Sequence, residues 1–327
     1  MDKDNYIVTV VVPVYNHERY IEQAIMSIYN QKTDYKYKVL IGEDKSTDNS
    51  REILKKLQKK LPENFIFLYR EQNMGIQNFY DMYERITTKY YIVLEGDDFW
   101  CDDKKLQKQI EFIEKHPQYI GVSHWINIVD QNGNDSNVDR KEITGEYRFK
   151  DYKNGRMPGH TSSKLLKYEF YDYKKKYINR FTDLKYPGDQ IEAFLIADLF
   201  KIYCIPEKMS SYRYITDSGT SYSATHKFDS NAKINRIKFY YYNYIFSKEN
   251  NGNNKITELS QLQYIFFMYR FRKDLKIPKE LLKKEIRKSV KIFKIYIFIL
   301  ARIKKALFAK IGGIFKKNKR KIKYFTT

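Results

Sequence analysis

Acidic side chains gather in two short stretches, each directly after a run of apolar residues. One is Glu43–Asp48 and the other is Glu95–Asp98, and each holds three carboxylates. Carboxylates this close repel one another unless a cation lies between them, and hard divalent ions such as Mg²⁺ and Mn²⁺ prefer oxygen ligands. Such an ion also neutralises charge that develops on a departing diphosphate. The two stretches therefore predict metal-assisted chemistry on a phosphorylated ligand.

The second stretch has the more informative spacing. Gly96 separates Glu95 from Asp97, and a glycine there lets the backbone turn or lets a ligand approach closely. An ordinary acidic turn is the alternative interpretation. The aromatic pair Phe99-Trp100 that follows, and the apolar run before it, favour a ligand site.

Strand and helix patterns alternate through the first 130 residues and must position these carboxylates. The predicted strands are Ile7–Val14, Tyr37–Gly42, Phe65–Tyr69, Tyr90–Leu94 and Ile120–Val129. The predicted helices are Tyr20–Asn30, Ser46–Lys60, Asn78–Ile86 and Asp103–Lys115. This alternation predicts an α/β fold, with a mostly parallel central sheet and helices on both faces. The polar residues that follow the strands would then meet at one edge, where open α/β sheets bind ligands.

The pattern loosens after residue 130. Ser163–Tyr171 and Asp189–Phe200 are predicted helices, and Ile202–Pro206 and Ser211–Tyr214 are predicted short strands. From residue 231 the chain is predicted to be helical with basic faces.

Three motifs together resemble glycosyltransferase family 2. They are Val11–Asn16, Glu43–Asp48 and Glu95–Trp100, at spacings that suit that family. The resemblance is strong over residues 5–130 and weak over residues 155–225. It implies a GT-A, Rossmann-like fold. It also implies inverting transfer of one sugar from a nucleotide-diphosphate sugar, expected to be a UDP-sugar, to an acceptor hydroxyl.

The resemblance also assigns roles to residues of the donor site. Pro13 and Tyr15 would line the base pocket, Glu95 would contact the ribose, and Asp97 would bind Mn²⁺ or Mg²⁺. One of two acids, Glu43 or Asp44, would hydrogen-bond the base. The residues expected to bind the nucleotide sugar are Pro13, Tyr15, Asn16, Glu43, Asp44, Ser46, Asn73, Gly75, Glu95, Gly96 and Asp97. The family usually has Asp where this chain has Glu95, so Glu95, Asp97 and Asp98 all stay open as metal ligands.

Inverting transfer requires a carboxylate that takes a proton from the acceptor hydroxyl. The predicted base is Asp189, about 90 residues beyond the acid motif, where the family places its base. The alternative is structural, because Asp189-Gln190-Ile191-Glu192 has the pattern of a capping box with Asp189 as N-cap. Asp98, Trp100 and His160 are expected on the acceptor side, although a lone histidine is more often structural.

A Gly/Ser-rich segment follows residue 215. Arg213, Ser218 and Ser221 are expected to form a loop over the diphosphate, with His226 as a further candidate for the metal. An ordinary linker is the alternative interpretation.

The positive charge is concentrated at the C-terminal end. Residues 286–327 contain 14 Lys or Arg and no acid, so they carry +14 of the formal +21 and leave +7 for residues 1–285. Ile286, Val290, Phe293, Ile297, Leu300, Leu307, Ile311 and Ile314 form an apolar stripe among these cations. A basic amphipathic helix predicts binding to an anionic membrane surface. Nucleic acid, or packing on the domain or a second subunit, are the alternatives.

The remaining features limit the class of protein. Two distant cysteines argue against a disulfide scaffold and a zinc site, and the longest uncharged apolar run near the end is too short to span a bilayer. We therefore expect a cytoplasmic protein peripheral on the inner face of the membrane. The expected domains are residues 1–230, with halves 1–115 and 116–230, and a helical basic region 231–327.

By analogy with the family, the expected role is bacterial cell-surface polysaccharide or glycan synthesis, with a sugar or lipid-linked glycan as acceptor. A nucleotidyltransferase of related fold is the nearest alternative, but the first loop lacks the glycines that would hold a triphosphate. A non-catalytic protein that binds nucleic acid or membrane is the second alternative.

Overall fold

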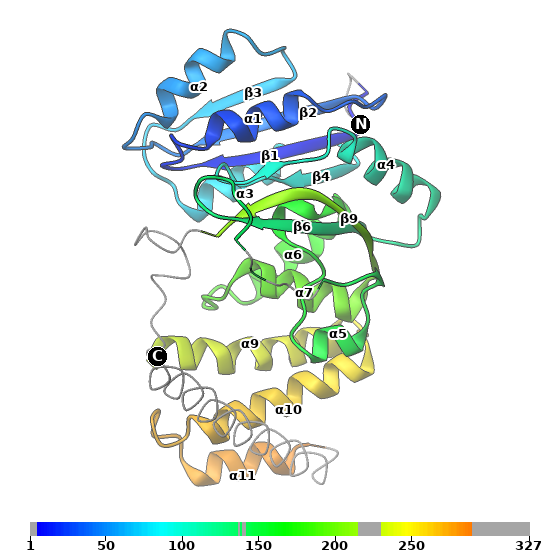
Figure 1. Cartoon of the computed structure of the whole chain (residues 1–327). Coiled ribbons are helices and arrows are strands. Elements are labelled where there is room, and N and C mark those ends of the chain that lie inside the picture. Colours follow the sequence, from blue (N-terminus) through cyan, green and yellow to red (C-terminus); the bar gives the residue numbers. More distant parts are fainter. Residues whose placement is uncertain (1–4, 137, 139–141, 215–229, 290–327) are drawn as a thin grey trace, which may run out of the picture. The chain divides into compact units, whose positions relative to one another are not determined.

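The chain divides into two compact units. The computed structural model describes residues 5–136, 138, 142–214 and 230–289 (Figure 1). The first unit comprises Met1–Asp183 and Pro187–His226, and the second comprises Leu184–Tyr186 and Lys227–Thr327. The predicted domain limits at residues 115 and 230 stay predictions.

Within the described residues, nine strands of the first unit form one sheet in the order β3-β2-β1-β4-β8-β6-β9-β5, with β7 paired to β9. The strands are β1 (Val8–Val14), β2 (Tyr37–Glu43), β3 (Phe65–Tyr69), β4 (Tyr90–Val93), β5 (Phe99–Trp100), β6 (Gly121–Val129), β7 (Gly145–Glu146), β8 (Leu165–Lys167) and β9 (Ile202–Arg213). Strands β3, β2, β1 and β4 are parallel, whereas β8 is antiparallel to both β4 and β6. The parallel part brings the ends of β1, β2 and β4 to one edge.

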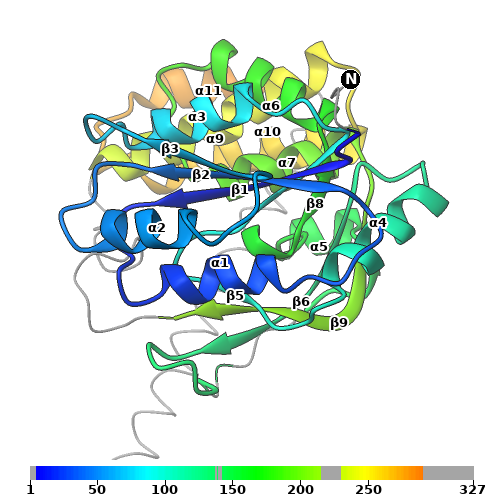
Figure 2. The same cartoon turned by 90° about the horizontal axis from the view of Figure 1, so that it is seen from above.

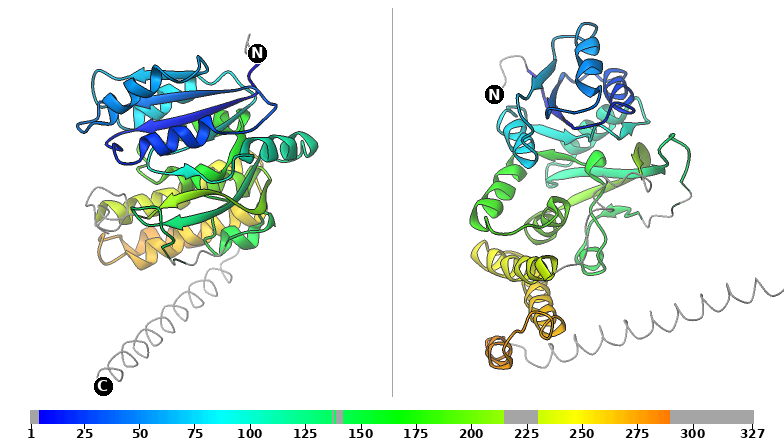
Figure 3. Two further views of the ribbon diagram at one scale, coloured as in Figure 1. Left: turned by 45° about the horizontal axis from the view of Figure 1, so that its top comes forward. Right: turned by 90° about the vertical axis from the view of Figure 1, so that its left-hand side faces the viewer.

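Helices lie on both faces of the parallel part of the sheet (Figures 2 and 3). One face carries α1 (Ile21–Tyr29), α2 (Ser50–Gln58) and α4 (Lys105–Lys115). The other carries α3 (Ile76–Glu84), α6 (Glu169–Arg180) and α7 (Gly188–Leu199). The short elements α5 (Phe149–Lys153) and η1 (Thr161–Ser163) complete the unit. The predicted α/β fold class is confirmed.

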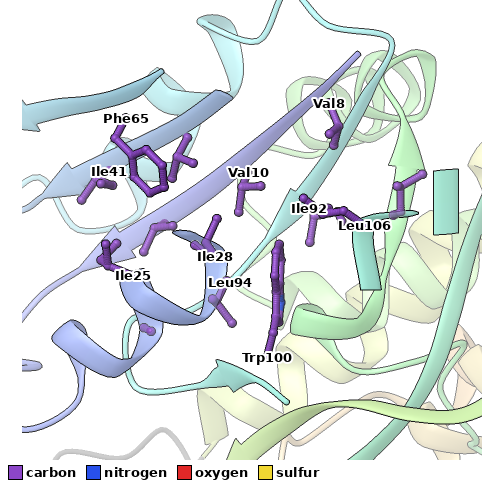
Figure 4. Packing of buried hydrophobic residues seen from close by; sticks show 14 of the residues in the cluster. Val8, Val10, Ile25, Ile28, Ile41, Phe65, Ile92, Leu94, Trp100 and Leu106 are labelled. Atoms are coloured by element: carbon purple, nitrogen blue, oxygen red, sulfur yellow. The ribbon is translucent and has the colours of Figure 1, made fainter. Parts of the chain in front are cut away.

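Alternation along β4 separates two packed layers. Ile92 and Leu94 lie in the core cluster that also holds Ile25 and Ile28 of α1 (Figure 4). Tyr91 points to the opposite face, where its ring meets Tyr83 of α3 edge-on, and the Tyr83 ring stacks on Tyr171 of α6. Odd-numbered residues of this strand therefore face α3 and α6.

Two predictions for the second half were wrong. Ser163–Tyr171 is not one helix: Leu165 and Leu166 pair with Ile92 and Tyr91 as strand β8, and a helix begins only at Glu169. The second wrong prediction was of two short strands, Ile202–Pro206 and Ser211–Tyr214. The structure has one continuous strand, β9, over Ile202–Arg213. The register against β6 shifts there from Ile205 to Lys208, so the proline occupies a bulge and needs no ladder hydrogen bond.

The second unit is helical where it is described, as predicted. It contains α9 (Ser230–Glu249), α10 (Asn254–Arg270) and α11 (Lys279–Arg287). The Tyr240 ring of α9 stacks on the Phe267 ring of α10, with 5.3 Å between their centroids. Of the predicted apolar stripe, Ile286 packs beside Leu282, and the rest lies outside the described residues. In the described part of the chain, no helix has both the length and the apolar composition required to cross a membrane.

Candidate active site

The loops after β1 and β2 are bonded to each other at the sheet edge. Asn16 adopts a positive φ of 58° and donates its N–H to Ser46 Oγ at 3.1 Å. In return, Asn16 Oδ1 accepts the Thr47 N–H at 2.8 Å. Tyr15 beside them is 43% exposed, whereas Pro13 is buried in β1. The exposed Tyr15 ring is thus free to meet a base, and the expected contact of Pro13 stays a prediction.

The two acids that end β2 are already bonded within the protein. Asp44 accepts the N–H groups of Met74 and Gly75 at 2.7 and 2.8 Å, and its carbonyl accepts the Asn73 amide at 3.2 Å. Glu43 accepts the Ser46 N–H at 2.6 Å and the Arg51 guanidinium. Asp44 therefore fixes the Asn73–Gly75 loop beside the edge. That one of the two acids also holds a base stays a prediction.

The loop after β4, Glu95–Asp98, holds three carboxylates and is called the acid loop below. Burial, and next the carboxylates of Asp97 and Asp189, raise the pKa of Glu95 to about 7, while Lys164 opposes this. Asp98 is 1% exposed, and burial followed by Asp97 and Glu95 raises its pKa well above the usual range. The fold thus brings the carboxylate of Asp189, from α7, close enough to interact electrostatically with the acid loop.

Gly96 is required by a close neighbour that the motif did not reveal. A Cβ on Gly96 would lie 2.6 Å from Nδ1 of His17. The His17 main chain is held by Ser50 Oγ at 2.8 Å, and its buried Nδ1 has no hydrogen-bond partner among the described residues. His17 directly follows the Val11–Asn16 motif, and this position was the one sequence feature that could have indicated its place in the site.

Three side chains offer a cation site. The ligand atoms of Glu95, Asp98 and His160 lie within 4.8 Å of one another, and His160 Nδ1 is 3.7 Å from Asp98 Oδ2. Asp98 Oδ1 accepts the Arg213 N–H at 3.0 Å, but the buried Oδ2 has no hydrogen-bond partner among the described residues. The two carboxylates suit Mn²⁺ or Mg²⁺, whereas the imidazole is a ligand more typical of transition metals and so favours Mn²⁺ of these two. Asp97 is not in this group, and its role as a ligand stays a prediction.

The three residues expected on the acceptor side lie in different environments. Trp100 is 4% exposed and packs in the core with Leu106, so an acceptor could reach its ring only by opening that core. Asp98 likewise points inward. The His160 ring packs on Tyr212 at 4.4 Å and caps η1, so it joins the cation site and a structural turn at once.

Asp189 lies in the first turn of α7 and is exposed. The alternative, a capping box with Asp189 as N-cap, is wrong, because Pro187 is the N-cap and no side chain caps this helix. Asp189 Oδ1 accepts the N–H of the next residue, Gln190, at 2.7 Å. Glu192 turns instead to Lys164 and Lys174. Asp189 is therefore available to an acceptor beside the acid loop.

Arg213 ends β9 and is buried rather than open to a diphosphate. Its guanidinium lies 4.6 Å from the Tyr20 ring centroid and 4.9 Å from that of Phe99, and it donates to Gln23. The guanidinium therefore fastens β9 to α1, and its expected contact with a diphosphate stays a prediction. Ser218, Ser221 and His226 lie outside the described residues.

Comparison with known proteins gives relatives over part of the chain. TuaG of Bacillus subtilis (strain 168), named for teichuronic acid biosynthesis, is 35% identical over 108 residues, covering 33% of this chain and 42% of TuaG. A dolichyl N-acetyl-alpha-D-glucosaminyl phosphate diacetamido-dideoxy-glucuronosyltransferase of Methanococcus voltae is 26% identical over 220 residues, covering 63% of this chain and 66% of that protein. An uncharacterized Mycobacterium tuberculosis protein is 31% identical over 127 residues, and the chain spans only 37% of its length.

A solved structure shares the fold, and a family model matches the sequence. The structure of S. aureus TarS 1–349 in complex with UDP superposes with a TM-score of 0.55 at 18% identity, covering 86% of this chain and 78% of that chain. The model described as Glycosyl transferase family 2 matches residues 9–172, half of the chain. This protein therefore belongs to glycosyl transferase family 2, a family of transferases.

Proposed function

We propose that this protein transfers one sugar from a nucleotide-diphosphate sugar to an acceptor hydroxyl, with inversion at the anomeric carbon. The observation that carries the proposal is the convergence of Glu95, Asp98, His160 and Asp189 at one edge of the sheet. Open α/β sheets bind ligands at this edge. A cluster of carboxylates beside an exposed carboxylate supplies a cation site and a base.

The donor proposed is a UDP-sugar. The exposed Tyr15 ring and the bonded loops at Asn16, Ser46 and Asn73–Gly75 would form its nucleotide pocket. The TarS fold, which this chain shares, has been solved with UDP and with UDP-GlcNAc. That likeness supports the choice of nucleotide for the first test.

A divalent ion, Mn²⁺ or Mg²⁺, would be held by Glu95, Asp98 and His160, with Asp97 beside them. When bound, such an ion offsets the charge that develops on the diphosphate. The protein itself would keep the carboxylates together. It would also exclude water from Asp98, which is 1% exposed.

Asp189 would take the proton from the acceptor hydroxyl as that oxygen attacks the anomeric carbon from the side opposite the diphosphate. One displacement inverts the configuration and requires no nucleophile from the enzyme. A positioned general base contributes about 10²–10⁴-fold to such a step. The exposed side chain of Asp189 leaves room for the acceptor.

The acceptor proposed is a growing cell-surface glycan, carried on a lipid. TuaG is named for teichuronic acid biosynthesis, and the Methanococcus voltae transferase is named for a sugar carried on dolichyl phosphate. The basic segment after residue 286 would hold the enzyme on the inner face of the membrane, beside such an acceptor.

A thermal-shift screen of nucleotide sugars with and without Mn²⁺ tests the donor site. We expect one UDP-sugar to raise Tm only when Mn²⁺ is present, and Asp98→Asn to abolish that rise. Asp130→Asn, at a partly exposed turn acid that is not among the site residues, is the control and should respond like the wild type. No rise with any nucleotide sugar would refute the proposal.

A further inference from the structure

Three buried charges lie behind the acid loop. Lys164 Nζ donates to Glu192 Oε2 at 2.5 Å, and Lys174 Nζ donates to Glu192 Oε1 at 2.7 Å. The side chains of Lys164, Lys174 and Glu192 are 3%, 10% and 11% exposed. Charges are rarely buried unless they are paired. Here two cations share one anion, so the group carries a surplus of one positive charge.

The group keeps these charges in the folded protein. Burial alone would raise the pKa of Glu192, but Lys164 and Lys174 lower it to about 2. Burial alone would lower the pKa of Lys174, but Glu192 raises it above its usual value. Glu192 and Lys174 therefore stay charged, and a further buried positive charge beside this pair is stable only next to an opposite one.

Strand register places Lys164 next to the acid loop. Leu165 of β8 pairs with Ile92 of β4 in an antiparallel ladder, and the same register continued by one residue beyond β8 would bring Lys164 opposite Val93. Side chains two residues apart share a face of a strand, so Glu95 follows Val93 on the face that Lys164 occupies. The charge of Lys164 is within electrostatic reach of Glu95.

Helix geometry places Glu192 on the same side of α7 as the candidate base, Asp189. Glu192 comes three residues after Asp189 in α7, so both lie on one side of its first turn. Lys164 is thus bonded to the helix of Asp189 and lies within electrostatic reach of Glu95. Lys174, from α6, bonds to Glu192 and lies 5.2 Å from the Tyr83 ring centroid.

We propose that Lys164 is a positioning residue for sugar transfer: Glu192 holds its ammonium against the acid loop, and this internal cation keeps Glu95 in place to receive the donor. The inference rests on the proposed function. The alternative is an ion network that stabilises the packing of α6 and α7 and has no bearing on the donor.

Lys164→Met and Lys174→Met separate these two roles. Each variant removes one buried ammonium and leaves Glu192 one partner, so both are expected to lower Tm. Only Lys164→Met should weaken UDP binding at saturating Mn²⁺, by about 10–100-fold, as supporting groups behind ligand sites commonly do. The Kd is measured by calorimetry at a temperature at which both variants are folded. Lys164→Arg, which keeps the charge, should recover most of the binding.

Donor and acceptor kinetics give a second readout. Lys164→Met should raise KM for the UDP-sugar about tenfold or more, with KM for the acceptor changed less than about twofold. Lys164→Gln keeps a hydrogen bond to Glu192 without the charge, and it should show the same loss of donor affinity if Lys164→Met does not fold. Equal donor affinity in the Lys164 and Lys174 variants, or wild-type affinity in Lys164→Gln, would overturn the inference. Absence of UDP binding by the wild type would instead refute the proposed function.

Discussion

Single residues of the acid loop set its protonation chemistry. Glu95 has a pKa of about 7, raised first by burial and then by Asp97 and Asp189. A carboxyl with a raised pKa holds its proton more tightly in the folded chain than in the unfolded chain. Its stabilising contribution is therefore present below the unfolded value of 4.5 and is lost as pH rises through 7.

Glu95→Gln should accordingly change the pH dependence of metal-free stability. At pH 5 the variant and the wild type should have similar free energies of unfolding, because Glu95 is mostly protonated. At pH 8 the variant should be more stable, by at most about 3 kcal/mol. Urea unfolding at the two pH values measures this. A difference that is the same at both pH values would show that Glu95 titrates normally.

Gly96→Ala probes the close contact with His17. The new Cβ would lie 2.6 Å from the imidazole Nδ1, and such overpacking costs about 1–3 kcal/mol. Gly188→Ala, where nothing lies within 4 Å, is the matched control and should lose less. Adding His17→Ala to Gly96→Ala should recover part of the loss in urea unfolding. No recovery would mean that the contact with His17 is not the cause.

Among the helices and strands, the sequence predicts those whose conformation follows from the residue pattern of the segment itself. The longer strands and the helices up to residue 129 were recognisable because apolar periodicity lies within each segment. The two-residue strand β5 was missed, because its conformation depends on pairing with β9. Leu165–Lys167 could not be recognised, since its strand conformation depends on pairing with β4, more than 70 residues away. The same holds for Lys164, Lys174 and Glu192, whose partners are 28 and 18 residues apart. The acid motif was visible because its residues are adjacent, whereas the contact of His160 with Asp98 is tertiary.

The loop at residues 73–75 is an element held by one side chain. Asp44 accepts the N–H groups of Met74 and Gly75, and Gly75 has a φ of 55°. Asp44→Ala leaves both donors without that acceptor, at a cost of about 0.5–1.5 kcal/mol each, because Met74 is half-buried and Gly75 is exposed and water can replace the carboxylate. Hydrogen exchange at these two amides should accelerate at least tenfold in the variant. Unchanged exchange would show that the loop is held by other contacts.

At the scale of the whole molecule, charge is the most uneven property. Residues 286–327 carry 14 of the 61 Lys and Arg and no acid. Each cation near an anionic leaflet contributes about 1 kcal/mol to binding, and the contribution falls as salt screens it. The full chain should therefore float with vesicles that contain phosphatidylserine. It should bind less at high salt.

A chain truncated after Lys284 is the control for that experiment. It should stay at the bottom of the gradient with the same vesicles. Neutral phosphatidylcholine vesicles should bind neither protein. Equal flotation of the full and truncated chains would place membrane binding elsewhere or remove it.

The assignment of separate roles to the acid loop and to Asp189 is tested most directly by comparing Asp189→Asn with Asp98→Asn. Asp189→Asn should bind the UDP-sugar and Mn²⁺ at least as tightly as the wild type, yet its kcat should fall about 10²–10⁴-fold. Asp98→Asn should lose donor binding itself. If Asp189→Asn transfers sugar at the wild-type rate, or if Asp98→Asn binds the donor normally, these residues do not form the transfer site.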